Sequence, residues 1–348
     1  MKQSKRYLLN FVSVLVLGFS GISGQSKLPD FKTQFSPEEG YLQAWNFTFH
    51  NERYSVFSTF LVSNFGPGSK NNGISILIKE KGNPLYYSTR EFSIDDYESN
   101  PDTFHQRSGE NWMEYKDGLY SFYMKYPEWE IKLSYKPKKG SVPISNGKFP
   151  LLDPANFVQA DIPFSFSSVT GTIKKGDVIE EVSGTGGMEH LLTNYPVYKF
   201  SKKWELVRAE TKNGFRIFTG GFIGNSNFPG KFYRRVVVLS PNGEPTIEAT
   251  VEGAEVLKWE KDSISGYTIP KLEKLTFFEG SCSILVNRTK TIASMSALEN
   301  ISSFLRFFIQ LFFAKPYQIH SSAEVSVDCP KTWSGMGKGS HSNYLINE

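Results

Sequence analysis

The residues best suited to chemistry lie near the middle of this sequence, where Glu189 and His190 follow glycines at 184, 186 and 187. A histidine beside a carboxylate can transfer protons, because imidazole titrates near neutral pH and a carboxylate stabilises its charged form. The glycines permit close backbone approach, which an ordinary strand does not need. Glu189 and His190 are therefore the candidate catalytic residues. The alternative is a bulged turn between strands in which His190 is a structural residue.

Side chains around this pair could line a ligand site. Aromatic side chains suit an apolar ligand, and cationic side chains suit a polar or acidic head group. We expect His190, Tyr195 and Trp204 to line the principal cavity. Lys203 and Arg208 should lie at its rim. The full set of candidate ligand-binding residues is Trp45, His190, Asn194, Tyr195, Tyr198, Lys203, Trp204, Arg208 and Trp259.

Motifs of several other enzyme classes are absent from the sequence. It has no Gly-x-Ser-x-Gly element and no Walker A motif, and the glycines at 335–339 are not preceded by a predicted strand or followed by a predicted helix. No His-x-x-x-His or Cys-x-x-Cys pair occurs, which argues against zinc. We therefore expect no metal and no cofactor.

Composition indicates a globular protein with two domains. The chain has 348 residues, of which 39% are hydrophobic and 21% charged. This length allows two domains, each with its own hydrophobic core. Aromatic residues make up 15%, and they favour strands and line apolar cavities. The net charge of +4 argues against a nucleic-acid partner, which would require a basic stripe.

Alternation of apolar and polar residues predicts strands along most of the chain. Trp45, Phe47 and Phe49 alternate with polar residues, and residues 54–63 continue the pattern. Short strands separated by turn residues are typical of a sandwich or barrel. Residues 137–160 are rich in Pro, Gly and Lys and are predicted to form a long loop. The second half, between 203 and 291, repeats the strand pattern.

A single helix is predicted late in the chain. Ser296 and Glu299 form a capping box, apolar residues recur at helical spacing over 298–312, and Pro316 ends the helix. A strand over 317–328 follows. Residues 331–348 are rich in Gly, Ser, Asn and Lys and are predicted to form a flexible tail.

The N-terminus has the pattern of a secretory signal peptide. Positive residues at 2, 5 and 6 precede an apolar run at 8–19 and small residues at 21 and 23. We expect residues 1–24 to be removed and the protein to be periplasmic or secreted; the alternative is an uncleaved membrane anchor. An exported chain can oxidise its two cysteines, and we predict a disulfide between Cys282 and Cys329, across the helix.

The central segment also carries a family resemblance. Gly-Thr-Ile at 171–173, the segment 184–190 and Lys203-Trp204 together resemble the central signature of the survival-factor-1-like proteins. These belong to a calycin group that includes AttH-type proteins, hydroxyneurosporene synthase (a carotenoid hydratase) and decalin-forming pericyclases. Residues 45–49 resemble the aromatic first strand of the group, and 313–318 resemble the opening of its last strand. The resemblance covers residues 38–330.

The resemblance implies an all-β fold of two lipocalin-like barrels with one C-terminal α-helix. The first domain would span 26–195 and the second 196–330, with a pocket inside a barrel or between them. An eight-stranded barrel has room for one small ligand.

Two functions remain open at this point, beside a structural surface protein without a ligand. The first is an exported carrier of a hydrophobic small molecule, such as a lipid or an isoprenoid. The alternative is a hydratase or cyclase acting on an isoprenoid or polyketide-like substrate, with His190 as general acid and Glu189 as its partner. Trp204 or Trp259 would then stabilise a developing cation. The expected partner is the hydrophobic ligand, with transient membrane contact and no nucleic acid; the oligomeric state is left open.

Overall fold

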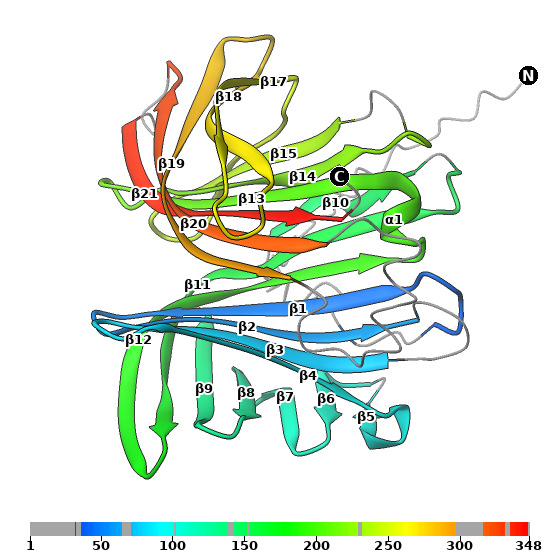
Figure 1. Ribbon diagram of the computed structural model, residues 1–348, viewed down its shortest axis with the longest axis vertical. Coiled ribbons are helices and arrows are strands. Elements are labelled where there is room, and N and C mark those ends of the chain that lie inside the picture. Colours follow the sequence, from blue (N-terminus) through cyan, green and yellow to red (C-terminus); the bar gives the residue numbers. More distant parts are fainter. Residues whose placement is uncertain are drawn as a thin grey trace, which may run out of the picture.

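The computed structural model describes residues 32, 36–64, 71–100, 102–137, 142–151, 153–228, 232–296, 316–330 and 335–346. Nearly all of them lie in two antiparallel sheets, which form the lower and upper halves of the molecule in Figure 1. The expected signal peptide and the expected helix at 298–312 lie outside the described residues. Within the described residues, no helix is long and apolar enough to span a bilayer.

The first sheet spans residues 42–193 and curls into a barrel, called the first barrel below. Within the described residues it has 12 strands, in the order β4-β3-β2-β1-β12-β11-β9-β8-β7-β6-β5, and β10 pairs with β11 off this path. A 3₁₀ turn, η1 (Ile94–Asp96), follows β4. The strands of this first sheet are β1 (Leu42–His50), β2 (Tyr54–Ser63), β3 (Asn71–Glu80), β4 (Leu85–Phe92), β5 (Tyr97–Ser99), β6 (His105–Ser108), β7 (Asn111–Lys116), β8 (Leu119–Lys125), β9 (Trp129–Pro137), β10 (Val142–Pro150), β11 (Phe157–Lys175) and β12 (Val178–Thr193).

Aromatic side chains fill the interior of the first barrel. The predicted alternation in β1 places Trp45, Phe47 and Phe49 inward, and all three are fully buried. The ring of Phe47 lies 5.1 Å from that of Phe122 and 5.4 Å from that of Tyr135, measured between centroids. Rings at these distances form a packed core.

The second sheet spans residues 201–345 and forms the second barrel. It follows a short helix, α1 (Val197–Phe200), and within the described residues it has nine strands, in the order β16-β15-β14-β13-β21-β20-β19-β18-β17. The strands are β13 (Ser201–Thr211), β14 (Arg216–Gly224), β15 (Phe232–Leu239), β16 (Pro245–Thr250), β17 (Gly253–Lys261), β18 (Thr268–Phe277), β19 (Cys282–Ser296), β20 (Tyr317–Asp328) and β21 (Gly335–Leu345).

The predicted flexible tail at 331–348 is wrong for residues 335–345. These residues form β21, which pairs with β13 on one side and β20 on the other. Its glycines give it the composition of a loop, but they serve close packing. A Cβ added at Gly339 would lie 1.7 Å from the Arg208 carbonyl oxygen, so only glycine fits there. The second domain therefore extends beyond residue 330.

The glycine-rich stretch at 184–190 is a continuous strand, so the bulged turn considered as an alternative does not form there. It belongs to β12, which pairs with β1 and β11. A Cβ at Gly186 would lie 2.0 Å from the Thr48 carbonyl oxygen and 2.8 Å from the Tyr135 ring. The glycines therefore allow β1 and the ring of Tyr135 to approach β12 closely, and they do not mark a turn. The predicted loop at 137–160 likewise contains β10.

The cysteines form the predicted disulfide, with a Cα–Cα distance of 4.4 Å between Cys282 and Cys329. Cys282 opens β19 and Cys329 follows β20, and register pairs their neighbours Ser283 and Asp328. Both cysteines are buried in the apolar part of the second barrel. The bond thus joins two neighbouring strands at this end of the barrel.

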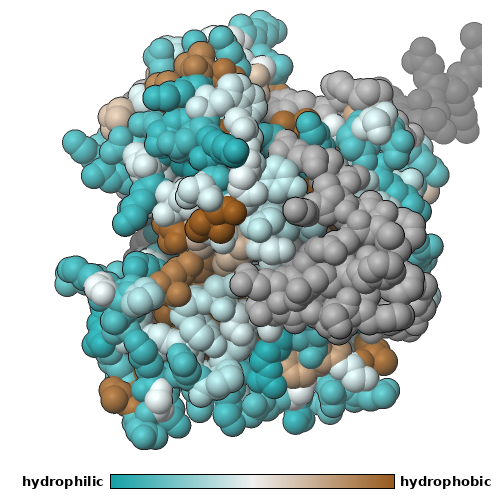
Figure 2. All heavy atoms as spheres, viewed as in Figure 1, coloured by the Kyte–Doolittle hydropathy of each residue, from teal (hydrophilic) through white to brown (hydrophobic). Residues whose placement is uncertain are grey.

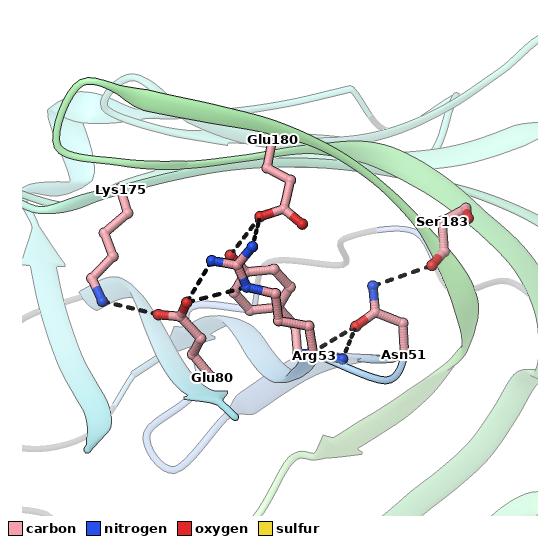
Figure 3. Close-up of polar contacts among 7 residues, drawn as sticks. Asn51, Arg53, Glu80, Lys175, Glu180 and Ser183 are labelled. Atoms are coloured by element: carbon pink, nitrogen blue, oxygen red, sulfur yellow. Dashed lines mark hydrogen bonds and ion pairs between the residues drawn. The ribbon is translucent and has the colours of Figure 1, made fainter. Parts of the chain in front are cut away.

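A network of polar side chains fastens the hairpin of β11 and β12, which projects at the lower left of Figure 1, to the first barrel. In Figure 3, Arg53 lies between the carboxylates of Glu80 and Glu180, at 2.8 and 2.7 Å. Lys175 donates to the other oxygen of Glu80 at 2.9 Å. Hydrogen bonding from Arg53 and Lys175 lowers the pKa of Glu80. This network closes the end of the barrel that lies at the His50 end of β1.

The two barrels meet along the outward faces of β12 and β13. An aromatic cluster spans the junction. Figure 2 shows hydrophobic residues, in brown, where the upper and lower halves of the molecule meet. A second contact packs Leu77 of β3 against Ala293 and Met295 of β19. The Arg216 guanidinium donates to the carbonyl of Ser165 across the same junction.

Candidate functional site

His190 points into the first barrel, at the end opposite the Arg53 network. Register places it directly between Trp45 of β1 and Asp161 of β11. His190 and Asp161 are each only 2% exposed, and Trp45 is fully buried. Two predicted ligand-binding residues, Trp45 and His190, therefore lie together, with ring centroids 5.8 Å apart.

Hydrogen bonds connect His190 to a carboxylate on one side and a carboxamide on the other. Its Nδ1 lies 3.0 Å from Asp161 Oδ2, and its Nε2 lies 2.8 Å from Gln43 Nε2. Since the Gln43 nitrogen can only donate, Nε2 is the acceptor and Nδ1 carries the proton. Gln43 Nε2 also donates to the Lys32 carbonyl at 3.0 Å, and Gln43 Oε1 accepts from the Tyr41 hydroxyl at 2.8 Å. This assignment gives the neutral imidazole one defined tautomer.

Asp161 is aimed inward by an irregularity in its strand. The pairing of β11 with β12 shifts register between Asp161 and Phe164, and such a bulge re-aims side chains. Asp161 Oδ2 accepts a second hydrogen bond, from Gln159 Nε2 at 2.7 Å. Its other oxygen, Oδ1, has no hydrogen-bond partner among the described residues. One face of this carboxylate is thus left available for a proton or a polar group.

Glu189 does not partner His190, so that prediction is wrong. Successive residues of a strand face opposite sides, and β12 is regular at this point. Glu189 points out of the barrel and forms a two-pronged ion pair with Arg208 of β13. The carboxylate that serves His190 comes from the neighbouring strand instead.

Arg208 is held between the barrels rather than at the rim of a cavity. Its guanidinium lies over the Phe57 ring at 5.3 Å and bonds to the Tyr344 hydroxyl. Burial alone would lower the pKa of Arg208, but the Glu189 carboxylate raises it overall. Burial and the charge of Arg208 lower the pKa of nearby His320 to about 4. The Glu189–Arg208 pair thus forms a charged link across the junction.

Four further predicted residues lie at or near the junction. Tyr195 and Trp204 belong to the aromatic cluster, where the Trp204 ring is 5.2 Å from that of Phe222. Asn194 bonds to the backbone of Phe157 and Ala155, a structural role. Tyr198 lies in α1, with the Lys199 ammonium over its ring.

The last two predicted residues belong to the second barrel. Lys203 points into its interior and pairs with Glu205 at 2.8 Å. Trp259 of β17 is 53% exposed, and its ring lies 5.8 Å from the Lys203 ammonium. His190 thus lies inside the first barrel, whereas Tyr195 and Trp204 lie in the packed cluster at the junction, so these three predicted residues are not brought together.

Asp161 and Gln43 were not among the residues predicted from the sequence. Asp161 is a lone carboxylate inside an apolar strand, Val158 to Phe166, which was a usable signal because such residues are rarely buried without a partner. Gln43 shares the inward periodicity of Trp45 and Phe47, which was also visible. Neither residue stands near His190 in sequence. Among the described residues, no three His, Cys, Asp or Glu side chains gather to hold a metal ion.

Comparison with solved structures finds proteins that share this fold over most of their length. A putative AttH from Nitrosomonas europaea aligns with a TM-score of 0.63 and 10% identity, over 87% of this chain and 92% of its own. Kievitone hydratase from Nectria haematococca gives 0.59 and 11%, over 88% and 89%. CghA with Sch210972 gives 0.60 and 9%, also over 88% and 89%. No family model and no curated protein matches the sequence.

These similarities confirm the fold inferred from sequence. The chain has two lipocalin-like barrels, one nearly closed and one a half-barrel, as in these solved structures. At such low identity the likeness concerns the fold, and function must be argued from the site itself.

Proposed function

We propose that the protein is a cofactor-independent enzyme of the hydratase or cyclase kind, acting on an apolar unsaturated substrate such as an isoprenoid or a polyketide-like chain. The observation that carries this proposal is the buried Asp161–His190 pair beside Trp45. The similarity to a protein named as a hydratase agrees with it. Fold likeness alone would not suffice.

The pair has the arrangement that proton transfer requires. Asp161 accepts from Nδ1–H, fixes the tautomer and stabilises the imidazolium that forms when Nε2 takes a proton. The position of the Gln43 amide, 2.8 Å from Nε2, marks where a water or substrate oxygen would bind in its place. Trp45 presents an aromatic ring to a developing positive charge.

Hydration of a double bond balances with these groups when His190 is protonated at both ring nitrogens. Nε2–H gives its proton to one alkene carbon and leaves a carbocation on the other, beside the Trp45 ring. The water oxygen bonds to the cationic carbon, and the proton that this water loses returns to Nε2. In an intramolecular cyclisation a second double bond would attack the cation in place of water, and loss of a proton to Nε2 would complete the reaction.

A carrier of hydrophobic ligands, the other function considered from sequence, has less support. Burying a histidine and an aspartate costs free energy and gives no advantage in binding a purely apolar molecule, so the pair favours catalysis over carriage. Aromatic rings pack the middle of the first barrel, with centroids 5.1–6.1 Å apart, so an apolar molecule of either kind would have to bind nearer to the Gln43 end of the barrel.

The test is an activity screen with a matched pair of variants. The purified protein is incubated with farnesol, geranylgeraniol and prenylated phenols in ¹⁸O-labelled water, and mass spectrometry looks for addition of one labelled water or for an isomer of unchanged mass. Asp161→Asn keeps the shape and an acceptor oxygen but loses the charge that stabilises imidazolium. We expect it to lower the rate by about 100-fold or more.

Asp117→Asn is the control, because Asp117 lies in an exposed turn with positive φ, which asparagine tolerates. The control should match the native protein in rate and in melting temperature. Conversion by Asp161→Asn at the native rate would overturn the assigned pair. A native mass spectrum showing a co-purified lipid, together with no turnover of any probe, would favour the carrier.

A further inference from the structure

Polar and charged side chains fill one part of the second barrel's interior, in contrast to the apolar part around the disulfide. They come from strands all round the sheet and are almost inaccessible. Those of Arg234, His341 and Asn343 are 1%, 1% and 0% exposed. The other buried members are Ser201, Lys203, Glu205, Thr219, Glu273, Arg288 and Ser321.

The charged members neutralise one another. Arg234 bridges two carboxylates, contacting Glu205 through one nitrogen and Glu273 through the other, at 2.9 Å for the latter. Lys203 supplies the second positive charge, 2.8 Å from Glu205. Burial alone would raise the pKa of Glu205, but the charges of Arg234 and then Lys203 lower it to about 2. The third buried cation, Arg288, pairs with Glu260 at 2.6 Å. Each cation is thus matched by a carboxylate, which leaves this cluster without a strong preference for a charged ligand.

Several neutral members have no hydrogen-bond partner among the described residues. These atoms are both ring nitrogens of His341 and both amide atoms of Asn343. The hydroxyls of Ser201, Thr219 and Ser321 likewise have no hydrogen-bond partner among the described residues. A buried polar atom without a partner costs on the order of 1–3 kcal/mol, so this many in one place require something to bond to.

Register shows that these atoms form one continuous band. Ser321 is paired with His341 across β20 and β21. Asn343 is paired with Glu205 across β21 and β13. Val207, the partner of His341, is paired in turn with Thr219. The unpartnered groups therefore lie on the same inward face of the sheet, where one molecule bound against that face would reach several of them.

We propose that this band is a binding site for a small uncharged molecule rich in hydroxyl groups, such as a monosaccharide or a polyol. The available groups include donors and acceptors, which matches hydroxyls because each can act as either. Burial lowers the pKa of His341 to about 4, so the ring is neutral near pH 7 and offers one donor and one acceptor. The mutual neutralisation of the charges disfavours an anion.

The edge of the sheet offers a way in. Within the described residues β16 and β17 are the two outer strands of the sheet, and β17 is paired with β18 alone. Trp259 lies on β17, exposed on one side and facing the Lys203 ammonium on the other. Displacement of this one strand would open the polar band to solvent. The site is separate from the Asp161–His190 pair and does not depend on its role.

The experiment measures binding of glucose, maltose and myo-inositol to the full-length protein by calorimetry, with citrate as an anionic comparison. We expect at least one of the uncharged probes to bind and citrate not to bind. Asn343→Leu removes two of the unpartnered atoms with little change of volume. Losing two hydrogen bonds of about 1 kcal/mol each should weaken binding by about tenfold or more.

Asn287→Leu is the matched control, since Asn287 faces outward from the same sheet between the buried residues Val286 and Arg288. It should bind the probe as the native protein does. Asn343→Leu should also unfold at the native urea concentration or a higher one, because it removes buried polar atoms that lack partners. Binding of no uncharged probe at millimolar concentration would overturn the proposal. Preferential binding of citrate, or native affinity in Asn343→Leu, would do the same, as would a crystal grown with the probe that shows only ordered water on His341.

Discussion

The interiors of the two barrels differ more than their similar architecture suggests. The first is filled with aromatic rings and holds a single acid–base pair at one end. The second divides into an apolar part, beside the disulfide, and a part with buried ion pairs and unpartnered polar atoms. Both use the same inward periodicity of their strands. The comparison teaches that the strand pattern sets which residues are inside, while their chemistry is free to differ.

The largest expected effect tests the ion pairs of the second barrel. Arg234→Met leaves Glu205 and Glu273 buried without their shared cation, and breaking a buried pair in this way costs about 3–5 kcal/mol. Its neighbour Arg235 points outward to Glu248, so Arg235→Met should cost about 1 kcal/mol or less. Urea unfolding of both variants measures the difference. Equal losses of unfolding free energy would mean that the buried ion pairs contribute no more to stability than the outward-facing pair.

The disulfide distinguishes the barrels next. Replacing both Cys282 and Cys329 by serine releases a loop with a sequence separation of 47 and should lower stability by about 3–4 kcal/mol. The first barrel contains neither cysteine and should be unaffected. Limited proteolysis under reducing conditions should therefore cut within 201–345 before it cuts within 42–193. Cleavage in the opposite order would contradict this assignment.

Acid should weaken the second barrel through His341. Its folded pKa of about 4 lies below the ordinary 6.5, so the unfolded chain binds the proton more readily between these values. Stability is therefore lost as pH falls from about 6.5 to about 4, by up to about 3 kcal/mol for this group. His341→Phe should lower the number of protons taken up on unfolding between pH 4 and pH 6.5 by close to one, and so flatten the pH dependence of the free energy of unfolding measured with urea. An unchanged slope would show that His341 is not kept neutral by burial.

The smallest effect concerns the rim of the first barrel. Arg53 is the centre of the network in Figure 3, but its side chain is 53% exposed. Solvent weakens such pairs, so Arg53→Gln should cost far less stability than Arg234→Met. Thermal unfolding measures the loss, and a cost comparable to that of Arg234→Met would remove the contrast between exposed and buried pairs.

Much of the fold was predictable from sequence because alternation is a local property. The strands at 54–63 and 317–328 end where expected, and the disulfide pairs as expected. Glycines were the main source of error. In β12 and β21 they make room for neighbouring backbone and rings, a tertiary reason that resembles turn chemistry in sequence. The site was harder to predict for a similar reason, since the partner of His190 is set by strand pairing and lies on β11.

The placement of β21 bears on the order in which the two sheets can form during synthesis. The strands β1 and β12, which pair in the middle of the first sheet, are both complete once residue 193 has been added. In the second sheet, β13 gains its partner β21 only when residue 345 has been added. Both pairings join strands that are far apart in sequence, which makes them slow to form. The first sheet can therefore complete its central pairing while most of the second sheet is still being made.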